Sequence, residues 1–479
     1  MALLIIDIGS SSVKALLFDH QANALASVSR SWAFETTPPG ASTIEAAQAQ
    51  QTVEACIDEI LTRHPDAPIE AVAFDTFVGN VLGVDGRGRA ITPVFTYADT
   101  RSSDDVLTLQ QQVDTREMHR RTGCMHHTAY QPARLHWLRR VDPALFSAAD
   151  QWLDVGTYLY RQWFGESPCS YSVASWSGMF NRAALDWDAR WLDTLELPKS
   201  ALPPLADFTE ARRGLIAPYA TRWRRLCDVP FFLPIGDGAA ANVGSGCVDP
   251  SRVALSLGTT AALRVASAAE LPTVPYGLWG YRIDKRLHLI GGATTEGGSI
   301  FRWARETLWI ESLESAEGAL LARDADAHGL TFLPLLAGER SPGWAVDATG
   351  TIDGLRLSTT PLDLLQAALE AVALRLAIIA DQLDIPGATV VGSGGALTPL
   401  WSQIIADALD HPLHVLDPDT QITARGTAIL TLHALGIADL ASFPVPDGRT
   451  QLPRPEQADR LRAARERQQI LYRQLYSHA

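Results

Sequence analysis

The N-terminal part of the chain alternates between apolar runs and short polar breaks. Residues 3–6 are apolar, residues 7–12 are polar or small apart from Ile8, residues 13–18 are apolar apart from Lys14, and a further run follows at 24–28. Short apolar runs bounded by turn-forming residues are typical of buried strands. The pattern therefore predicts a meander of three antiparallel strands. A Walker-type nucleotide loop, which leads from a strand into a helix, does not fit this segment.

The same pattern returns in the second half of the chain. Mostly apolar residues at 253–257 and 261–265 flank a short turn. The segment Asp7-Ile8-Gly9-Ser10-Ser11 can be superposed on Ser256-Leu257-Gly258-Thr259-Thr260, and only the first copy carries a carboxylate. Repetition at this scale indicates an internal duplication. We place the boundary just before the second hairpin, which divides the chain into residues 1–248 and 249–479.

Helical and strand patterns alternate elsewhere in both halves. Residues 52–61 and 456–476 read as helices, and residues 69–74 as a strand. The clearest helix spans 365–383, where apolar residues recur at alternating steps of four and three. A short strand at 389–391 follows, and then a second helix with Thr398 as its N-cap. The chain is therefore expected to be an α/β protein.

The composition is that of a folded globular protein. Of 479 residues, 47% are hydrophobic and 20% are charged, close to globular averages. The net charge of -14 argues against nucleic acid as a partner. The N-terminal apolar run is too short for a signal peptide, and no stretch approaches the ~20 apolar residues of a membrane span. Because the five cysteines are scattered, no disulfide framework or zinc site is expected, and we predict a cytoplasmic protein without a membrane partner.

The two predicted turns carry glycine and hydroxyl side chains, which suit phosphate binding. Glycine lets the backbone approach a phosphate closely, and Ser or Thr adds hydrogen-bond donors. Asp7, at the end of the first strand, can hold a magnesium ion beside the first turn. Each turn taken alone is more simply an ordinary hairpin turn, but their duplication favours phosphate binding. The turn residues are Gly9, Ser10, Ser11, Ser12, Gly258, Thr259 and Thr260.

A run of small residues begins at Gly236-Asp237-Gly238, just ahead of the second hairpin. Besides phosphate and metal binding, phosphoryl transfer requires a base that takes the proton of the acceptor hydroxyl. Asp237 is a candidate for that base. An Asp at such a position is also a common N-cap of a helix, and spacing alone leaves both interpretations open.

The order of six motifs resembles the FGGY family of carbohydrate kinases nearly from end to end. The resemblance implies two actin-like (ribonuclease H-like) domains with a catalytic cleft between them, ATP and Mg²⁺ as cofactors, and Asp237 as the catalytic residue. It also implies that Gly394, Gly395 and Ala396 support the adenosine end of ATP. The motifs are Asp7-Ile8-Gly9-Ser10-Ser11-Ser12, Tyr97-Ala98-Asp99-Thr100-Arg101, Gly236-Asp237-Gly238, Gly258-Thr259-Thr260, Phe332-Leu333-Pro334 with Gly338-Glu339-Arg340-Ser341-Pro342, and Gly392-Ser393-Gly394-Gly395.

Within that family the chain is most similar to gluconokinases, on the stretches 96–102, 122–124, 132–138 and 178–181. The similarity implies an ATP-dependent kinase of a sugar or sugar acid, with D-gluconate as the leading substrate. A xylulokinase-like kinase of a ketopentose or polyol is the alternative. An actin-like ATPase or chaperone without a small acceptor is the alternative of another class. The oligomeric state is open, with a homodimer as one alternative.

The resemblance also implies a set of sugar-binding residues. Tyr97 stands where the family usually has tryptophan, and the sugar-contacting segment 75–80 departs from the family's residues. The exact sugar therefore stays open. Gln421 also replaces a commoner glutamate. The predicted set is Phe77, Val78, Tyr97, Asp99, Arg101, Tyr130 and Asp237.

A sugar acid needs a cation for its carboxylate, and guanidinium groups bind carboxylates bidentately. The candidates are Arg101, Arg134 and Arg340. For each the alternative is a structural ion pair, such as Arg101 with Asp99 or Arg340 with Glu339. The pair His126-His127 has no spaced partner that would complete a metal site, so a loop or substrate-edge role is expected.

Overall fold

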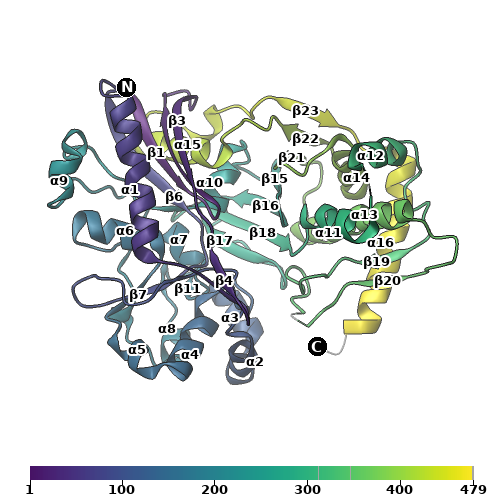
Figure 1. The fold of residues 1–479 in the computed structure, drawn as a ribbon, viewed down its shortest axis with the longest axis horizontal. Coiled ribbons are helices and arrows are strands. Elements are labelled where there is room, and N and C mark those ends of the chain that lie inside the picture. Colours follow the sequence, from purple (N-terminus) through teal and green to yellow (C-terminus); the bar gives the residue numbers. More distant parts are fainter. Residues whose placement is uncertain (311, 346, 477–479) are drawn as a thin grey trace.

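The computed structural model describes residues 1–310, 312–345 and 347–476, and each half of the chain builds one large β-sheet (Figure 1). The first sheet has the order β14 (Ile235–Gly236), β6 (Ile69–Thr76), β1 (Ala2–Ile8), β2 (Ser12–Phe18) and β3 (Ala24–Ser31). The second has the order β17 (Trp279–Arg282), β18 (His288–Thr294), β16 (Ala261–Ser267), β15 (Arg252–Leu257), β21 (Thr389–Ser393), β22 (Leu413–Leu416) and β23 (Gly448–Gln451).

The two sheets share one topology. Strand β1 pairs antiparallel with β2 and parallel with β6, as β15 pairs antiparallel with β16 and parallel with β21. Next to these, β2–β3 and β16–β18 are antiparallel, and β6–β14 and β21–β22 are parallel. The predicted meander and its repetition are confirmed. Strands β17 and β23 are additions at the two edges of the second sheet.

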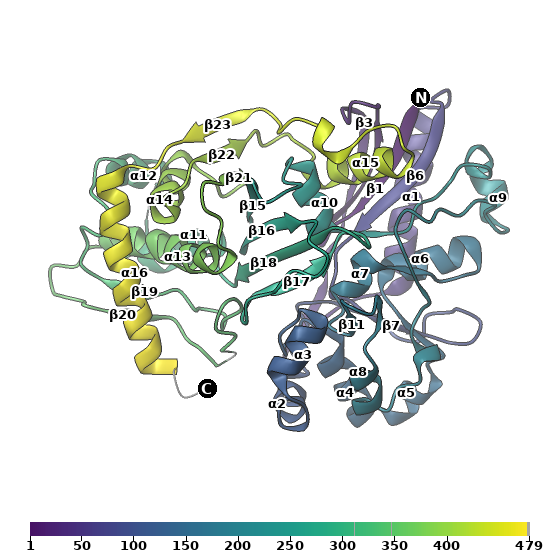
Figure 2. The same ribbon diagram turned by 180° about the vertical axis from the view of Figure 1, so that it is seen from behind.

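The first sheet is covered on both faces, which explains its continuous apolar strands. Helix α1 (Ala46–Arg63) covers one face and α15 (Ile422–Ala434) covers the other, as the two opposite views show (Figures 1 and 2). Residues Leu3 to Ile6 have no exposed surface. Helix α6 (Val155–Phe164) also packs against β6.

The predicted helices of the second half are also confirmed. Helix α13 (Pro361–Leu383) begins with a capping box in which Thr360 and Asp363 satisfy each other's backbone N–H groups. Helix α14 (Pro399–Leu409) begins at the N-cap Thr398, whose hydroxyl accepts from the Trp401 N–H at 3.3 Å. Helices α13 and α14 pack on strands of the second sheet, and α11 (Ser299–Leu308), α12 (Leu313–Leu321) and the C-terminal α16 (Pro455–Tyr476) pack on these two helices.

The remaining helices and strands lie mainly between β6 and β14 in the sequence and extend the first half into a lobe with its own apolar cluster. The helices are α2 (Ser103–Gln112), α3 (Thr115–Thr122), α4 (Gln131–Val141), α5 (Pro143–Ala148), α7 (Tyr171–Ser175), α8 (Ala189–Thr194) and α9 (Tyr219–Arg222). The short strands are β4 (Glu35–Thr37), β5 (Ala41–Ile44), β7 (Leu82–Val84), β8 (Val94–Phe95), β9 (Gln151–Leu153), β10 (Cys169–Ser170), β11 (Phe180–Asn181), β12 (Asp186–Trp187) and β13 (Leu205–Ala206), with β19 (Thr331–Leu333) and β20 (Thr351–Asp353) in the second half.

Two helices cross where the halves meet: α10 (Asp237–Gly244), which follows β14, and α15, which follows β22 (Figure 2). A Cβ on Gly426 would collide with the carbonyl oxygen of Ala240, and a Cβ on Gly244 would collide with that of Ile422. The two backbones therefore touch, and both glycines are required by the close approach. The crossing fixes how the halves sit on each other.

Helix α15 belongs to the second half of the sequence but to the core of the first sheet. Its residues Ala424, Ala428 and Ile429 are fully buried in the same apolar cluster as β1 and β6. The domain boundary at residue 248 therefore stays a prediction, because a helix from beyond that boundary packs in the core of the first sheet. Among the described residues, no helix combines the length and apolar character that a bilayer span requires.

Candidate functional site

A row of charged residues crosses the first sheet at the carboxyl ends of its parallel strands. Asp7 on β1 lies opposite Asp75 on β6 and opposite Lys14 on β2. Asp237 directly follows β14, the next strand along. The order across the sheet is therefore Asp237, Asp75, Asp7, Lys14. Three carboxylates gathered at one edge suit a cation and an acceptor hydroxyl better than a packed core.

Asp75 is the most buried member of this row. It has no exposed surface, and one carboxylate oxygen accepts from the Thr427 hydroxyl of α15 at 2.7 Å. Burial, and then the charge of Asp7, raises the pKa of Asp75 well above its ordinary value. Burial also raises the pKa of Asp7, and Lys14 opposes that change from 3.7 Å.

Two adjoining cavities lie next to this row. The first, of about 610 Å³, is lined by Asp7, Lys14, Ser256, Gly394 and Gly395 among others. The second, of about 570 Å³, is lined by Gly258, Thr259, Gly395, Ala396 and Phe301 among others. They meet at Gly395, and each is within the size range of small-molecule sites. The predicted second turn, the glycine turn after β21 and the end of β1 are thus brought together.

The two hairpin turns are placed differently. Gly9 to Ser12 lie at the β1–β2 turn, where the Gly9 N–H donates to the Ser12 carbonyl at 2.9 Å, but none of these residues lines either cavity. The second turn is exposed, and Gly297 and Gly298 N–H groups donate to the Thr259 and Gly258 carbonyls at 2.9 and 2.6 Å. Thr260 lies at the end of this turn without lining the cavities.

Gly394 is required by its position under the second turn. Its φ is +116°, and a Cβ there would collide with the carbonyl oxygen of Leu257. A larger residue would therefore push the β21 turn away from β15.

Asp237 is the first residue of α10, and the N-cap is Gly236. The N-cap interpretation of Asp237 is therefore wrong. Its side chain is half-buried and accepts from the Gly238 N–H at 2.7 Å. Burial raises its pKa to about 6, with Asp7 adding to the rise and the nearby Arg264 opposing it. At neutral pH the carboxylate is mostly ionised, as a general base must be.

An aromatic wall joins the halves beside Asp237. Trp176 lies over Gly236 and Gly238, where an added Cβ would be 2.8 Å from its indole ring. Trp176 stacks on Tyr281 at 3.7 Å between ring centroids. The hydroxyl of Tyr281 lies 2.6 Å from that of Tyr130. The predicted sugar contact Tyr130 is thus tied to the second half, close to the proposed base.

The other predicted sugar-binding residues are more dispersed. Val78 lies near Gly236, where an added Cβ would be 3.1 Å from its side chain. Tyr97 is 38% exposed and packs edge-on against Phe34 at 6.2 Å. Phe77 is fully buried and packs against Phe34 at 5.3 Å and against Trp32 at 6.2 Å. Packing accounts for Phe77 without a ligand.

Two of the three arginine candidates are occupied by structural contacts. Arg101 forms a bidentate ion pair with Asp99, at 2.6 Å for the shorter contact, and lies 4.5 Å from the centroid of the Trp137 ring. Arg134 is buried and donates to the carbonyls of Gly79 and Thr128 at 2.9 and 2.8 Å. The ion-pair alternative accounts for Arg101, and backbone carbonyls hold both terminal nitrogens of Arg134, whose buried Nε has no partner among the described residues.

Arg340 differs, because its expected partner is engaged elsewhere. Glu339 is buried and accepts from Arg375 and from the Tyr472 hydroxyl of α16. Within the described residues, the buried Nε of Arg340 has no hydrogen-bond partner. Its charge is close enough to lower the pKa of His127. The alternative of an ion pair between Arg340 and Glu339 is therefore wrong.

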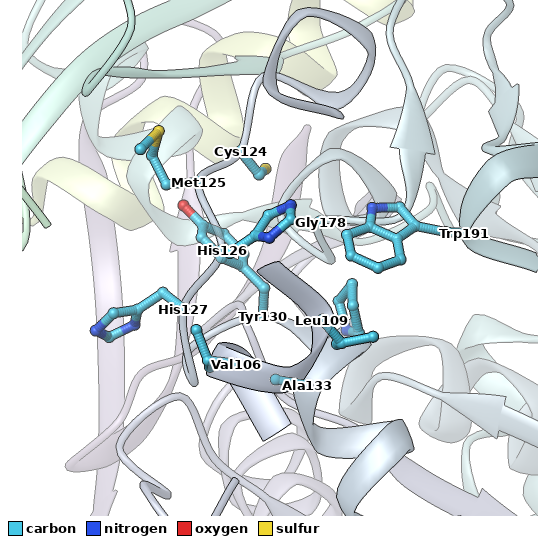
Figure 3. A pocket seen from close by; sticks show the side chains of 11 residues that line it. Val106, Leu109, Cys124, Met125, His126, His127, Tyr130, Ala133, Gly178 and Trp191 are labelled. Atoms are coloured by element: carbon cyan, nitrogen blue, oxygen red, sulfur yellow. The ribbon is translucent and has the colours of Figure 1, made fainter. Parts of the chain in front are cut away.

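A small void beside His126 is not a sugar site. Figure 3 shows His126, Trp191 and Leu109 around it. Its volume of about 10 Å³ is room for one water at most. Burial lowers the pKa of His126 to about 4, so the ring is neutral, and it packs 5.2 Å from Trp191.

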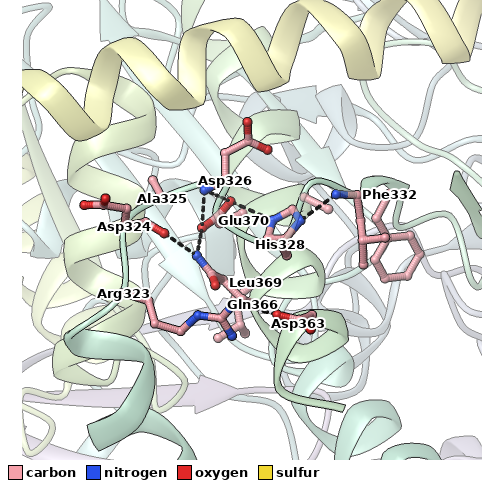
Figure 4. A network of polar contacts seen from close by, with 12 residues as sticks. Arg323, Asp324, Ala325, Asp326, His328, Phe332, Asp363, Gln366, Leu369 and Glu370 are labelled. Atoms are coloured by element: carbon pink, nitrogen blue, oxygen red, sulfur yellow. Dashed lines mark hydrogen bonds and ion pairs between the residues drawn. The ribbon is translucent and has the colours of Figure 1, made fainter. Parts of the chain in front are cut away.

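One group of possible metal ligands is recognised among the described residues: Asp326, His328 and Glu370, with donor atoms within 4.8 Å of one another (Figure 4). His328 Nδ1 accepts from the Leu330 N–H at 2.9 Å, so the neutral ring carries its proton on Nε2, which faces Glu370 at 3.1 Å. Arg467 pairs with Asp326 at 2.6 Å. Hydrogen bonds and an ion pair within the protein therefore engage these three side chains, and they hold the loop that carries Asp326 and His328 against Glu370 of α13.

Sequence reasoning missed Asp75, Lys14, Arg264 and Trp176 as members of the site. A signal existed for Asp75, because the apolar runs Ile5-Ile6 and Ala73-Phe74 are each followed by an aspartate, Asp7 and Asp75. Gln421 now has a role: its side-chain oxygen accepts from Lys14 Nζ at 3.0 Å. Since Gln421 is neutral, it does not compete with Asp7 for an ion pair with Lys14.

Comparison with known proteins agrees with this arrangement. The N-terminal domain model of the FGGY family of carbohydrate kinases matches residues 2–244, and the C-terminal domain model matches residues 253–435. A gluconokinase of Bacillus subtilis is 27% identical over 91% of this chain and 88% of its own. A xylulose kinase of Escherichia coli is 26% identical over 84% of each.

A gluconate kinase structure from Lactobacillus acidophilus superposes with a TM-score of 0.93, at 24% identity, over 99% of this chain and 98% of that one. The α/β fold with two actin-like domains and a cleft between them, predicted from the resemblance, is confirmed. The chain belongs to the FGGY family of carbohydrate kinases and is an ATP-dependent sugar kinase.

Proposed function

We propose that the chain transfers the γ-phosphoryl group of ATP to D-gluconate, with Asp237 as the general base. The main support is the row of carboxylates. The half-buried Asp237 lies at the same edge of the sheet as Asp7, and Asp7 lines a cavity large enough for a nucleotide. A base with a pKa of about 6 is suited to accept a hydroxyl proton near neutral pH. Membership of the family favours this reaction over an actin-like ATPase or chaperone.

The nucleotide is proposed to lie in the two adjoining cavities. Gly394, Gly395 and Ala396 would support the adenosine end, next to Phe301. The phosphates would extend toward Asp7 and Lys14, with the hydroxyls of Ser10 to Ser12 and of Thr259 and Thr260 on the two flanking turns. Hydroxyls and backbone N–H groups of this kind are the usual partners of a triphosphate.

Asp7 fits a magnesium ion, because its carboxylate faces the larger cavity and oxygen donors are what this ion prefers. When bound, the ion would neutralise charge on the phosphates. The residues' own part is positional: Lys14 on β2 holds Asp7, and Gln421, the N-cap residue of α15, holds Lys14.

Arg340 supports a sugar acid as the acceptor. A guanidinium whose Nε is buried without a partner among the described residues is costly unless a ligand satisfies it. A carboxylate is the ligand that matches its geometry. The gluconokinase relative points the same way, whereas the xylulose kinase relative supports the alternative of a ketopentose or polyol.

A coupled assay of ADP release tests the substrate. With D-gluconate, D-xylulose and glycerol compared, we expect the highest kcat/KM with gluconate and little ADP release without an acceptor, because cleft closure excludes water as an acceptor. A clear preference for xylulose or glycerol would overturn the gluconate assignment and leave the kinase class intact.

Arg340→Ala is expected to raise KM for gluconate about 30-fold or more, since removing one member of a buried charged pair costs about 2 kcal/mol or more. The activity with the uncharged sugars serves as the internal control and should change little. Equal losses with gluconate and with xylulose would show that Arg340 supports the loop rather than the carboxylate.

A further inference from the structure

Arg264 on β16 reaches toward the nucleotide side of the site. Its Nη1 donates to the Ser256 hydroxyl of β15 at 2.7 Å. Ser256 lines the cavity of about 610 Å³ together with Asp7 and Lys14. Ser256 also occupies the position of Asp7 in the duplicated hairpin. The second half therefore has a hydroxyl hydrogen-bonded to the guanidinium of Arg264 where the first half has a carboxylate.

The same side chain lies against the proposed base on its other side. A Cβ on Gly238, the residue after Asp237, would be 3.5 Å from Arg264 Nε. The charge of Arg264 lowers the pKa of Asp237, and that of Asp237 partly opposes the fall in the pKa of Arg264 caused by burial. Arg264 therefore spans the space between the nucleotide cavity and the base.

One N–H donor of Arg264 is left without a hydrogen-bond partner among the described residues. Its Nε is buried and has no hydrogen-bond partner in the part of the chain that the structure describes. The next charges around it are Asp237 and Arg340, with the Tyr281 ring from β17. An N–H donor left unpaired beside a base and a nucleotide cavity favours an anionic ligand that occupies the gap only during the reaction.

We propose that Arg264 is a further catalytic residue, which binds the γ-phosphoryl group while it passes from ATP to the acceptor. In this step the bond between the γ-phosphorus and the β,γ-bridging oxygen breaks, and its electron pair leaves with ADP. The acceptor oxygen bonds to phosphorus and its proton moves to Asp237. Negative charge spreads over the equatorial phosphoryl oxygens, and the guanidinium offers them planar, paired donors.

This inference rests on the proposed role of Asp237, and the test separates the two. Arg264→Gln is expected to lower kcat about 100–1,000-fold with KM for ATP and sugar nearly unchanged, because a donor used only in the transition state acts on kcat. Arg264→Lys should recover part of that loss. The acceptor is whichever sugar gives the wild type its highest kcat/KM, so the assay does not depend on gluconate.

The pH profile tests whether the charge of Arg264 lies beside Asp237, and the fall in kcat tests its catalytic role. The wild-type rate should fall below a pH of about 6, where Asp237 becomes protonated. Without the cation of Arg264 this acid limb is expected to move to higher pH. Asp7, Asp75 and Arg340 face the same space and are unchanged in the variant.

Arg252→Gln, on the neighbouring strand β15, is the matched control and should keep wild-type kinetics, because its guanidinium donates to the Gly246 carbonyl instead. A thermal unfolding curve establishes that each variant is folded. If Arg264→Gln leaves kcat unchanged, whether or not the sugar KM or the acid limb moves, the proposal is overturned. If Arg264→Gln loses activity while Asp237→Asn keeps it, the base assignment fails and the role of Arg264 stands.

Discussion

Asp237→Asn is expected to lower kcat by about 10²–10⁴-fold, the usual contribution of a general base. The amide keeps the size of the side chain and can still accept from the Gly238 N–H, but it cannot take the acceptor proton at neutral pH. ATP binding should stay nearly intact, because the cavity lining closest to the nucleotide is unchanged. Initial rates and calorimetric ATP binding measure the two effects.

Asp439→Asn, at an exposed position outside the site, is the control for the loss of one carboxylate and should behave as wild type. A kcat of Asp237→Asn within about tenfold of the wild-type value would remove Asp237 from the base role. In that case the neighbouring carboxylates Asp7 and Asp75 would be the next candidates, since they share the same sheet edge.

Gly426→Ala is expected to destabilise the protein by about 2–3 kcal/mol, because the added methyl group has no space at the crossing of α10 and α15. The neighbour is backbone, the carbonyl of Ala240, so no side-chain rotation can relieve the contact. Separation of the helices would also tilt Asp237, which begins α10, away from Asp7. The midpoint of urea unfolding and kcat should therefore fall together.

Gly318→Ala is the matched control, since Gly318 also lies in a helix, α12, but an added Cβ meets nothing within 4 Å. This variant should be as stable as wild type or more stable, by up to about 1 kcal/mol, from helix propensity alone. A Gly426→Ala variant that unfolds at the wild-type midpoint would show that the crossing can yield.

Local patterns predicted much of the fold. Buried apolar runs predicted β1, β2, β6 and β15, and the N-cap residue Thr398 predicted the start of α14, because strands and caps depend on neighbours in sequence. The exchange of α15 between the halves was not predictable in this way. Its burial depends on the shape of the first sheet, which no local spacing reports.

Site residues that belong to a local sequence motif were predicted. Site residues that only the pairing of distant strands brings together were missed. Asp7 and Gly395 were recognised through their turns, and they do line one cavity. Asp75 and Arg264 were missed, since a strand register is needed to place Asp75 opposite Asp7 and a second sheet is needed to aim Arg264 at Asp237. The pairing of Arg340 failed because Glu339 binds Arg375 and Tyr472, both distant in sequence.

The exchanged helix has a consequence for synthesis of the chain. The strands of the first sheet are complete once residue 236 has been made, yet the helix that covers their second face spans Ile422–Ala434. A growing chain therefore carries an open apolar face, with Ile5 and Ala73 among its residues, while most of the second half is still being translated. Such an intermediate is prone to aggregation, so production of this protein should depend on chaperones, and the first half made alone should be insoluble.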